Sequence, residues 1–231
     1  VSQGAICREE YRARGCDVDA AMVNMVDARR LDHVRAELLD RFKDENIDLL
    51  GVLPEEKLLA CPTVAEILSA LNGRVIYGEK FLDNIASGFS VAAMRLDSCL
   101  ERIPGGNLVI APGDRQDVIT GLMASQVSTT MENIAGMVLT AGLEPAPPVS
   151  RLMRGLRALR MPIITVDLNT FDTATAIDAV RSVIRPESHR KIDTVLSLFS
   201  RHVDAGSFRE KISVEAPETV TPRLFLHKIL Q

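Results

Sequence analysis

The chain has few aromatic residues and no tryptophan: seven Phe and two Tyr make up 4% of its 231 residues. It has no basic tract either, and its formal net charge is −4 with a pI near 5.6. Nucleic-acid binding uses aromatic side chains for base stacking and positive charge for the phosphates. The composition therefore argues against a nucleic-acid partner, and it offers no attraction to an anionic membrane surface.

The sequence also lacks metal-binding and membrane-spanning patterns. The four cysteines show no CxxC pairing, and the four histidines do not fall at metal-ligand spacing. No apolar run approaches the roughly twenty residues that cross a bilayer. The phosphate-loop pattern GxxxxGK[ST] is absent as well, so we expect no ATP hydrolysis. From the cysteine, histidine and apolar patterns together we expect no metal, no cofactor and a cytoplasmic location in which the thiols are reduced.

The hydrophobic content of 46% is enough for a sizeable core. After residue 73, short apolar runs alternate with helix-like segments, which predicts a three-layer α/β/α domain with a largely parallel sheet. A helix beginning at Pro62–Glu66 and ending at Gly73 precedes the first of these runs. The predicted strands are Arg74–Tyr77, Phe89–Ala93, Leu108–Ala111, Ala135–Thr140 and Pro162–Val166, and the predicted helices are Lys80–Ala86, Ser98–Ile103, Arg115–Gln126 and Val149–Arg160.

Two further segments flank this domain. Ala20–Val26 has the pattern of a buried parallel strand, an amphipathic helix runs from Leu31 to about Asn46, and Ile47–Leu53 is a second strand. Together they predict a βαβ unit. On the other side, apolar residues from Ile192 to Val203 predict an amphipathic helix, and the polar stretch Ala205–Pro217 is expected to be a linker.

The stretch LVIAPGDRQDVITG, from Leu108 to Gly121, has the build of a site. A buried strand meets a Pro-Gly break, and a helix follows. Asp114 can cap that helix, and Asp117 falls in its capping-box region. Arg115 then stands beside a helix N-terminus, where backbone donors favour an anion. The alternative is a well-capped helix with a solvated arginine.

Three loops follow parallel strands and should meet at the carboxyl edge of the sheet, where open α/β sheets bind ligands. They are Pro112–Asp114, Thr140–Gly142 and Asp167–Thr173, called the rim below. In the third loop, Thr170 or Asp172 can simply cap the next helix, and this reading stays open. The candidate ligand-binding residues are Gly113, Asp114, Arg115, Asp117, Thr140, Gly142, Asn169, Thr170 and Thr173.

The same stretch resembles the motif region of DRTGG domains, in the variant found within long bacterial phosphate acetyltransferases. GVLPEEKLLACPTVAEI, IAGMVLTAGLEPAPPV and PIITVDLNTFDTATAI resemble further blocks of those proteins in the same order, and VTPRLFLHKIL (Val220–Leu230) looks like the opening of their catalytic domain. One departure is present: Gln116-Asp117-Val118 stand where Thr-Gly-Gly follows Asp-Arg in the motif.

The resemblance implies a division of the chain. Residues 1–72 would be the end of a dethiobiotin-synthetase-like, P-loop-type domain without its P-loop, residues 73–188 a DRTGG domain, and residues 189–231 a helix, a linker and the first acetyltransferase helix. Asn24 and Asp27 match a strand-end sequence that lies near the nucleotide base in related proteins. We therefore read the chain as an excerpt of a longer protein.

The resemblance also implies a function. The parent enzyme would transfer an acetyl group between acetyl-CoA and phosphate, giving acetyl phosphate and CoA, through a catalytic domain outside this chain. The chain itself would be non-catalytic, would form a homo-oligomer, either dimer or hexamer, and would sense a metabolite. One alternative is a stand-alone DRTGG module that dimerises and senses a nucleotide or metabolite. Another is an autonomous dethiobiotin-synthetase-like enzyme, which the missing phosphate loop disfavours.

Overall fold

The computed structural model describes residues 10–11, 13–16, 18–186 and 188–212. These residues form two compact units, of which the first combines the described residues up to Glu55 with those from Leu196 to Ile212, and the second runs from Glu56 to Val195. The predicted acetyltransferase helix at Val220–Leu230 lies outside the described residues. Among the described residues, no helix is both long and apolar enough to cross a bilayer.

The first unit contains the predicted strand, helix and strand. β1 (Ala20–Val26) pairs in parallel with β2 (Asp48–Pro54), and α2 (Leu31–Asp44) connects them after the short 3-10 helix η1 (Ala28–Arg30). The prediction that β1 is buried was wrong: none of its residues is buried, and Met25 is 72% exposed. Among the described residues β1 pairs only with β2, so its other edge is not covered by a neighbouring strand.

The end of the first unit also differs from the prediction. Residues 205–212 are not a linker but the helix α10 (Ala205–Ile212), which follows α9 (His189–His202). The carboxylate of Asp204 accepts hydrogen bonds from the backbone N–H groups of Gly206 and Ser207, at 3.0 and 3.1 Å. This cap starts a helix in a stretch whose polar composition is typical of a turn.

The second unit is built on a five-stranded sheet in the order β3-β7-β6-β5-β4. β3 is antiparallel to β7, and every other pair is parallel, which confirms the predicted largely parallel sheet. The strands are β3 (Arg74–Tyr77), β4 (Gly88–Val91), β5 (Asn107–Pro112), β6 (Gly136–Thr140) and β7 (Ile163–Thr165).

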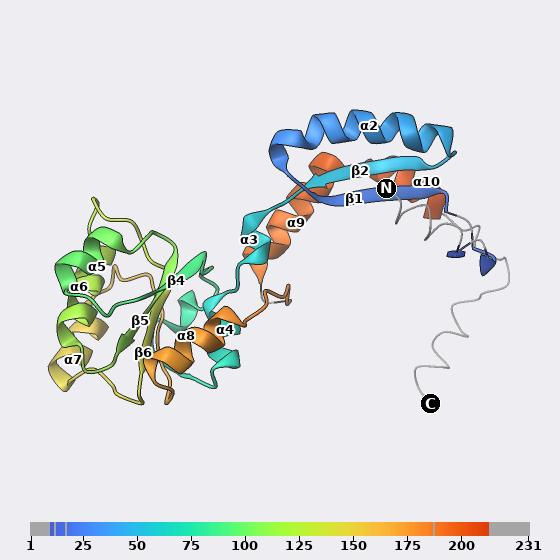
Figure 1. Ribbon diagram of the computed structural model, residues 1–231. Coiled ribbons are helices and arrows are strands. Elements are labelled where there is room, and N and C mark those ends of the chain that lie inside the picture. Colours follow the sequence, from blue (N-terminus) through green and yellow to red (C-terminus); the bar gives the residue numbers. More distant parts are fainter. Residues whose placement is uncertain (1–9, 12, 17, 187, 213–231) are drawn as a thin grey trace, which may run out of the picture. The chain divides into compact units, whose positions relative to one another are not determined.

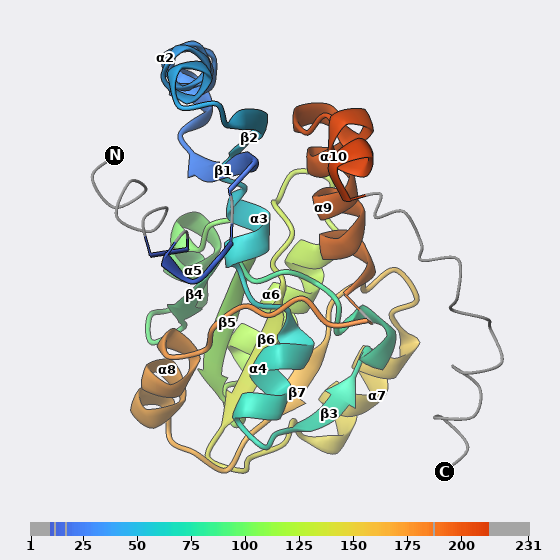
Figure 2. The same cartoon turned by 90° about the vertical axis from the view of Figure 1, so that its right-hand side faces the viewer.

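Helices cover both faces of this sheet (Figure 1), so the domain has the three layers that the sequence predicts. α5 (Leu96–Arg102), α6 (Gln116–Gln126) and α7 (Pro147–Gly155) pack on one face. α4 (Val64–Ala70) and α8 (Thr170–Asp178) pack on the other face and lie in front of the sheet in Figure 2. Because successive side chains of a strand point to opposite faces, Val109 joins the first core and Leu108 the second.

Residues 56–72, which the sequence analysis assigned to the first domain, belong to the second unit. The reason is packing: α4 contributes Val64 and Ile67 to the core beneath it, both fully buried. A capping box begins the helix, since Thr63 and Glu66 each accept a hydrogen bond from the other's backbone N–H. Asn72, and not Gly73, takes the left-handed conformation after the helix, with φ of 49°.

The predicted helix at Lys80–Ala86 is wrong, because only the 3-10 turn η2 (Glu79–Phe81) forms there. The carbonyls of Leu82 and Asn84 instead accept hydrogen bonds from the first N–H groups of α4. The predicted helix to Arg160 also stops early, at Gly155. Both differences arise where tertiary contacts use backbone groups that an isolated helix would keep for itself.

Candidate functional site

The turn after β5 packs directly against the loop after β6. Gly113 is buried there, and an added Cβ would overlap the backbone carbonyl of Leu143. Gln116 ties the two loops together: its Nε2 donates to the Gly113 carbonyl at 3.1 Å, and its Oε1 accepts from the Ala146 N–H at 3.0 Å. The glycine and the glutamine thus fix the turn after β5 against the loop after β6.

Arg115 and Asp117 form a two-pronged ion pair at the start of α6. Arg115 Nε donates to Oδ1 and Nη2 to Oδ2 of Asp117, both at 2.9 Å, and Nη2 also reaches the Met94 carbonyl at 3.1 Å. The hydrogen bonds from Arg115 lower the pKa of Asp117 from 3.8 to about 2. The same bonds raise the pKa of Arg115. The carboxylate therefore holds the guanidinium in one orientation.

The predicted capping roles at this helix were wrong. Arg115 itself occupies the N-cap position of α6, without a side-chain cap, and Asp114 is exposed. Asp117 binds Arg115 instead of closing a capping box. This pair depends on the departure from the DRTGG pattern, because a glycine at position 117 would have no carboxylate to offer.

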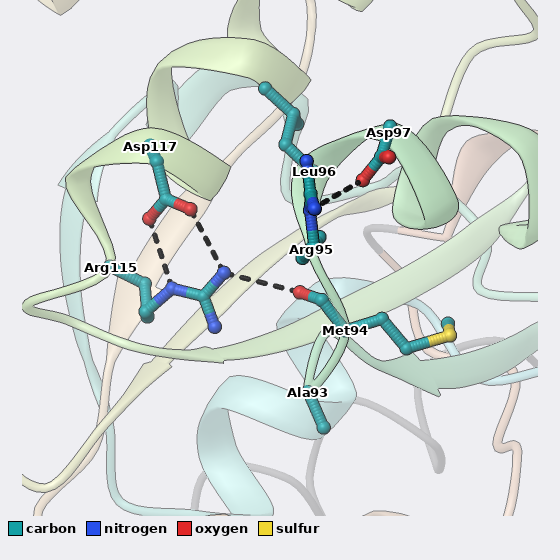
Figure 3. A pocket seen from close by; sticks show the side chains of 7 residues that line it. All are labelled: Ala93, Met94, Arg95, Leu96, Asp97, Arg115 and Asp117. Carbon is teal, nitrogen blue, oxygen red and sulfur yellow. Dashed lines mark hydrogen bonds and ion pairs between the residues drawn. The ribbon is translucent and has the colours of Figure 1, made fainter.

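A cavity of about 420 Å³ lies beside this ion pair. Figure 3 shows Arg115 and Asp117 on one side, and the loop from β4 to α5 on the other, where Arg95 Nε lies 3.5 Å from Asp97. The cavity is at the carboxyl ends of the parallel neighbours β4 and β5. It is lined by Ala93, Met94, Arg95, Leu96, Asp97, Arg115 and Asp117.

Sequence reasoning missed the β4–α5 loop as part of this site. The sequence pattern predicts a strand that ends near residue 91. It does not predict that this strand, β4, lies next to β5, because the strand order is a property of the whole sheet. Gln116 was also missed, although it is part of the departure from the motif. A polar side chain that replaces a motif residue needs hydrogen-bond partners of its own, so the departure at position 116 could have indicated a contact here.

The second and third loops of the rim lie side by side, as predicted. The hydroxyls of Thr140 and Thr170 share a hydrogen bond of 3.0 Å. The N–H of Ala141 donates to the Leu168 carbonyl and that of Gly142 to the Val166 carbonyl, both at 2.8 Å. Gly113 connects this pair to the first loop through a longer bond from its N–H to the Thr140 carbonyl, 3.4 Å.

The polar residues at the start of α8 bind one another. Asn169, not Thr170 or Asp172 as predicted, is the N-cap, and its Oδ1 accepts from the Asp172 N–H at 2.9 Å. Its Nδ2 donates to the Asp172 carboxylate at 2.7 Å. Thr173 is buried and donates to the Asn169 carbonyl at 2.7 Å. The structure therefore brings these candidates together, and their role in ligand binding stays a prediction.

The two candidate base-reading residues belong to the first unit. Asn24 Oδ1 accepts from the N–H of Met25, whose φ is 61°. Asp27 binds Arg29 through its backbone N–H and its guanidinium, at 2.8 to 3.2 Å, and these bonds lower the pKa of Asp27. Both side chains thus shape the end of β1 locally. Among the described residues, no cluster of three potential metal ligands was found.

The ion pair at α6 gives a direct pH test. We expect Arg115→Gln to return the pKa of Asp117 from about 2 toward 3.8, measured by a carboxyl NMR titration. Because the folded pKa is depressed, the contribution of this carboxylate to stability is present above pH about 4 and is lost as the pH falls toward about 2. Arg95→Gln is the control and should leave Asp117 unchanged. A pKa still near 2 in Arg115→Gln would contradict the assigned cause.

Comparisons with known proteins show what the chain is similar to. Residues 66–180 match the DRTGG domain family. A phosphate acetyltransferase of Nitratidesulfovibrio vulgaris is 34% identical over 221 residues, covering 94% of this chain and 31% of that protein. A phosphate acetyltransferase of Synechocystis is 29% identical over 222 residues, covering 96% of this chain and 32% of that protein.

A solved structure is also similar: the CBS and DRTGG domains of the regulatory region of Clostridium perfringens pyrophosphatase, complexed with the activator diadenosine tetraphosphate. It is 16% identical, has a TM-score of 0.41, and the match covers 79% of this chain and 86% of that one. The chain spans about a third of the length of the curated relatives it matches, and its residues 66–180 are a DRTGG domain.

Proposed function

We propose that this chain is the regulatory and oligomer-forming region of a phosphate acetyltransferase. The parent reaction would be acetyl-CoA plus phosphate to acetyl phosphate plus CoA, with these substrates bound by a catalytic domain outside the chain. The observation that carries the proposal is the extent of the similarity. It covers 94% and 96% of the chain in the two relatives, far more than the DRTGG domain, yet under a third of each relative.

This extent favours the proposal over a stand-alone DRTGG module, since a shared module alone would match only residues 66–180. The proposal keeps the segment up to Glu55 as the end of a dethiobiotin-synthetase-like domain, with Asn24 and Asp27 at its strand end, and leaves residues 56–72 with the second unit, in which they pack. It also includes a homo-oligomer, a dimer or hexamer, and a cytoplasmic location, in which Cys16, Cys61 and Cys99 stay free thiols.

The proposal further assigns the rim and the adjoining cavity to a small anionic metabolite. Arg115, whose side chain is 31% exposed, and Arg95 both line the cavity, each paired with an aspartate of the same lining, Asp117 and Asp97. The rim supplies fixed backbone and hydroxyl groups beside them. Control of activity requires that the metabolite bind two states of the protein with different affinity.

Thermal unfolding against a metabolite panel tests the assignment. We expect one of ATP, ADP, NADH, pyruvate, phosphoenolpyruvate, CoA or acetyl phosphate to stabilise the chain, by about 2.7 kcal/mol at a hundredfold its dissociation constant. Arg115→Gln should abolish this shift and Thr170→Ala should weaken it. Thr175→Ala is the matched control, because Thr175 lies on the same helix and its hydroxyl donates only to the Phe171 carbonyl.

Light scattering on the same samples tests the oligomer. If the chain forms a defined dimer or hexamer but no metabolite changes its thermal stability, its role is assembly alone and metabolite sensing is overturned. A monomer that responds to no metabolite would contradict both parts of the proposal.

A further inference from the structure

The second unit buries an ion pair that the rim does not use. Lys191, in the first turn of α9, has a side chain only 1% exposed, and Glu66, in α4, one that is 5% exposed. The ammonium Nζ donates to Glu66 Oε2 at 2.8 Å and to the Ser182 hydroxyl at 2.7 Å. Two buried charged side chains need hydrogen-bond partners for their polar atoms. The atoms of this pair have them.

The partners come from three segments of the chain. Glu66 Oε2 also accepts from the Thr63 N–H at 2.7 Å, and Oε1 accepts from the Val183 N–H at 2.8 Å. The Ser182 hydroxyl donates to the Leu59 carbonyl at 2.7 Å. Burial raises the pKa of Glu66, but the bonds from Lys191, Thr63 and Val183 outweigh it and lower the pKa overall. The carboxylate is therefore ionised at neutral pH.

This arrangement is not a nucleophilic site, despite a serine and a lysine in contact. The Ser182 hydroxyl already gives its proton to a backbone carbonyl, and the charged ammonium that binds it has no lone pair to act as a base. The cluster therefore holds segments of the chain together and does not activate a nucleophile.

The place of the cluster indicates what it does. Leu59, Thr63 and Glu66 lie where the chain enters the second unit, and Ser182, Val183 and Lys191 lie where it leaves. A buried ion pair is often no more stabilising than apolar residues of similar size, so stability alone does not account for one. What directional hydrogen bonds add is a defined geometry between the segments they join.

We propose that Lys191, Glu66 and Ser182 form a lock that fastens the incoming and outgoing segments of the DRTGG domain to each other. One network then holds both connections: Lys191 binds Ser182 of the outgoing segment and Glu66 of the incoming one, and without it the Ser182 hydroxyl loses the ammonium and Glu66 loses its cation. This inference goes beyond the proposed function, because it rests on the second unit alone and holds with or without a metabolite.

The test separates locking from stability. Lys191→Met leaves a buried carboxylate unpaired and should lower the melting temperature by roughly 10 °C. The double variant Glu66→Met/Lys191→Met should recover part of that loss, because it removes the unpaired carboxylate but leaves the Thr63 and Val183 N–H groups without their acceptor. Yet it should be cut by trypsin after Arg181, at the outgoing segment, about tenfold faster than the wild type under native conditions. Arg190→Met, an exposed change beside Lys191, is the control and should be cut at the wild-type rate.

Ser182→Ala provides a second arm that keeps the ion pair. It removes one bond to the ammonium and one to the Leu59 carbonyl, and should raise the cleavage rate several-fold. If the double variant folds and resists trypsin as well as the wild type does, the lock is refuted. If the double variant does not fold, Ser182→Ala decides alone, and an unchanged cleavage rate in it overturns the proposal.

Discussion

Gly113→Ala is expected to lower the free energy of unfolding of the second unit by about 3 kcal/mol, the upper end for overpacking. The new Cβ would overlap the Leu143 carbonyl, which belongs to the backbone and cannot rotate away like a side chain. The loops after β5 and β6 would have to separate, and the bonds of Gln116 that join them would stretch. Urea unfolding followed by circular dichroism measures the change.

Gly155→Ala is the matched control for this prediction. Gly155 ends α7, its φ is not positive, and an added Cβ there meets nothing within 4 Å. Alanine in a helix is favoured over glycine by up to about 1 kcal/mol, so this variant should be at least as stable as the wild type. A Gly113→Ala protein within 0.5 kcal/mol of the wild type, on the scale of an ordinary surface change, would mean that the two loops are not packed as described.

Leu139→Ala should cost about 4 kcal/mol, within the range measured for buried leucines. Leu139 is fully buried in β6, the middle strand of the sheet, and packs in the core beneath α5, α6 and α7. Truncation there removes apolar contacts and leaves a cavity that the paired strands β5 and β7 cannot close. Urea midpoints at an unchanged slope measure the loss.

Leu152→Ala tests whether this cost comes from burial. Leu152 lies on α7 and is 50% exposed, so its truncation should change stability by no more than about 0.5 kcal/mol. Equal losses in the two leucine variants would contradict the assignment of β6 to the centre of the core. The comparison uses the same chemical change at both positions and isolates the contribution of burial.

The start of α6 was predictable from the local sequence pattern, but the contacts of its first residues were not. The apolar spacing after Asp117 predicted α6 within one residue of its observed start, because Val118, Leu122 and Met123 face a core and are buried. The role of Arg115 was not predictable in the same way. Its partner Met94 is 21 residues away and meets it only because β4 lies beside β5.

The same contrast holds where the prediction failed. Lys80–Ala86 has a helical pattern, but the carbonyls of Leu82 and Asn84 serve the start of α4, so the chain there stays irregular. At α8 several residues near Thr170 had the chemistry of a cap, but the helix starts at Thr170, so Asn169 is its N-cap, and the Thr170 hydroxyl binds Thr140 on the neighbouring loop. In both segments, the observed structure includes hydrogen bonds to residues that are distant in the sequence, and a short stretch of sequence does not show these.

The sequence by itself determined the strands, most helices and the layered class, because apolar periodicity and burial act over a few neighbouring residues. It also determined that the loops after β5, β6 and β7 gather at one edge. Only the tertiary structure decided the strand order, the cavity at Arg115 and the buried contact of Lys191 with Glu66. Those features join residues up to 125 positions apart, and such pairings depend on how the elements pack.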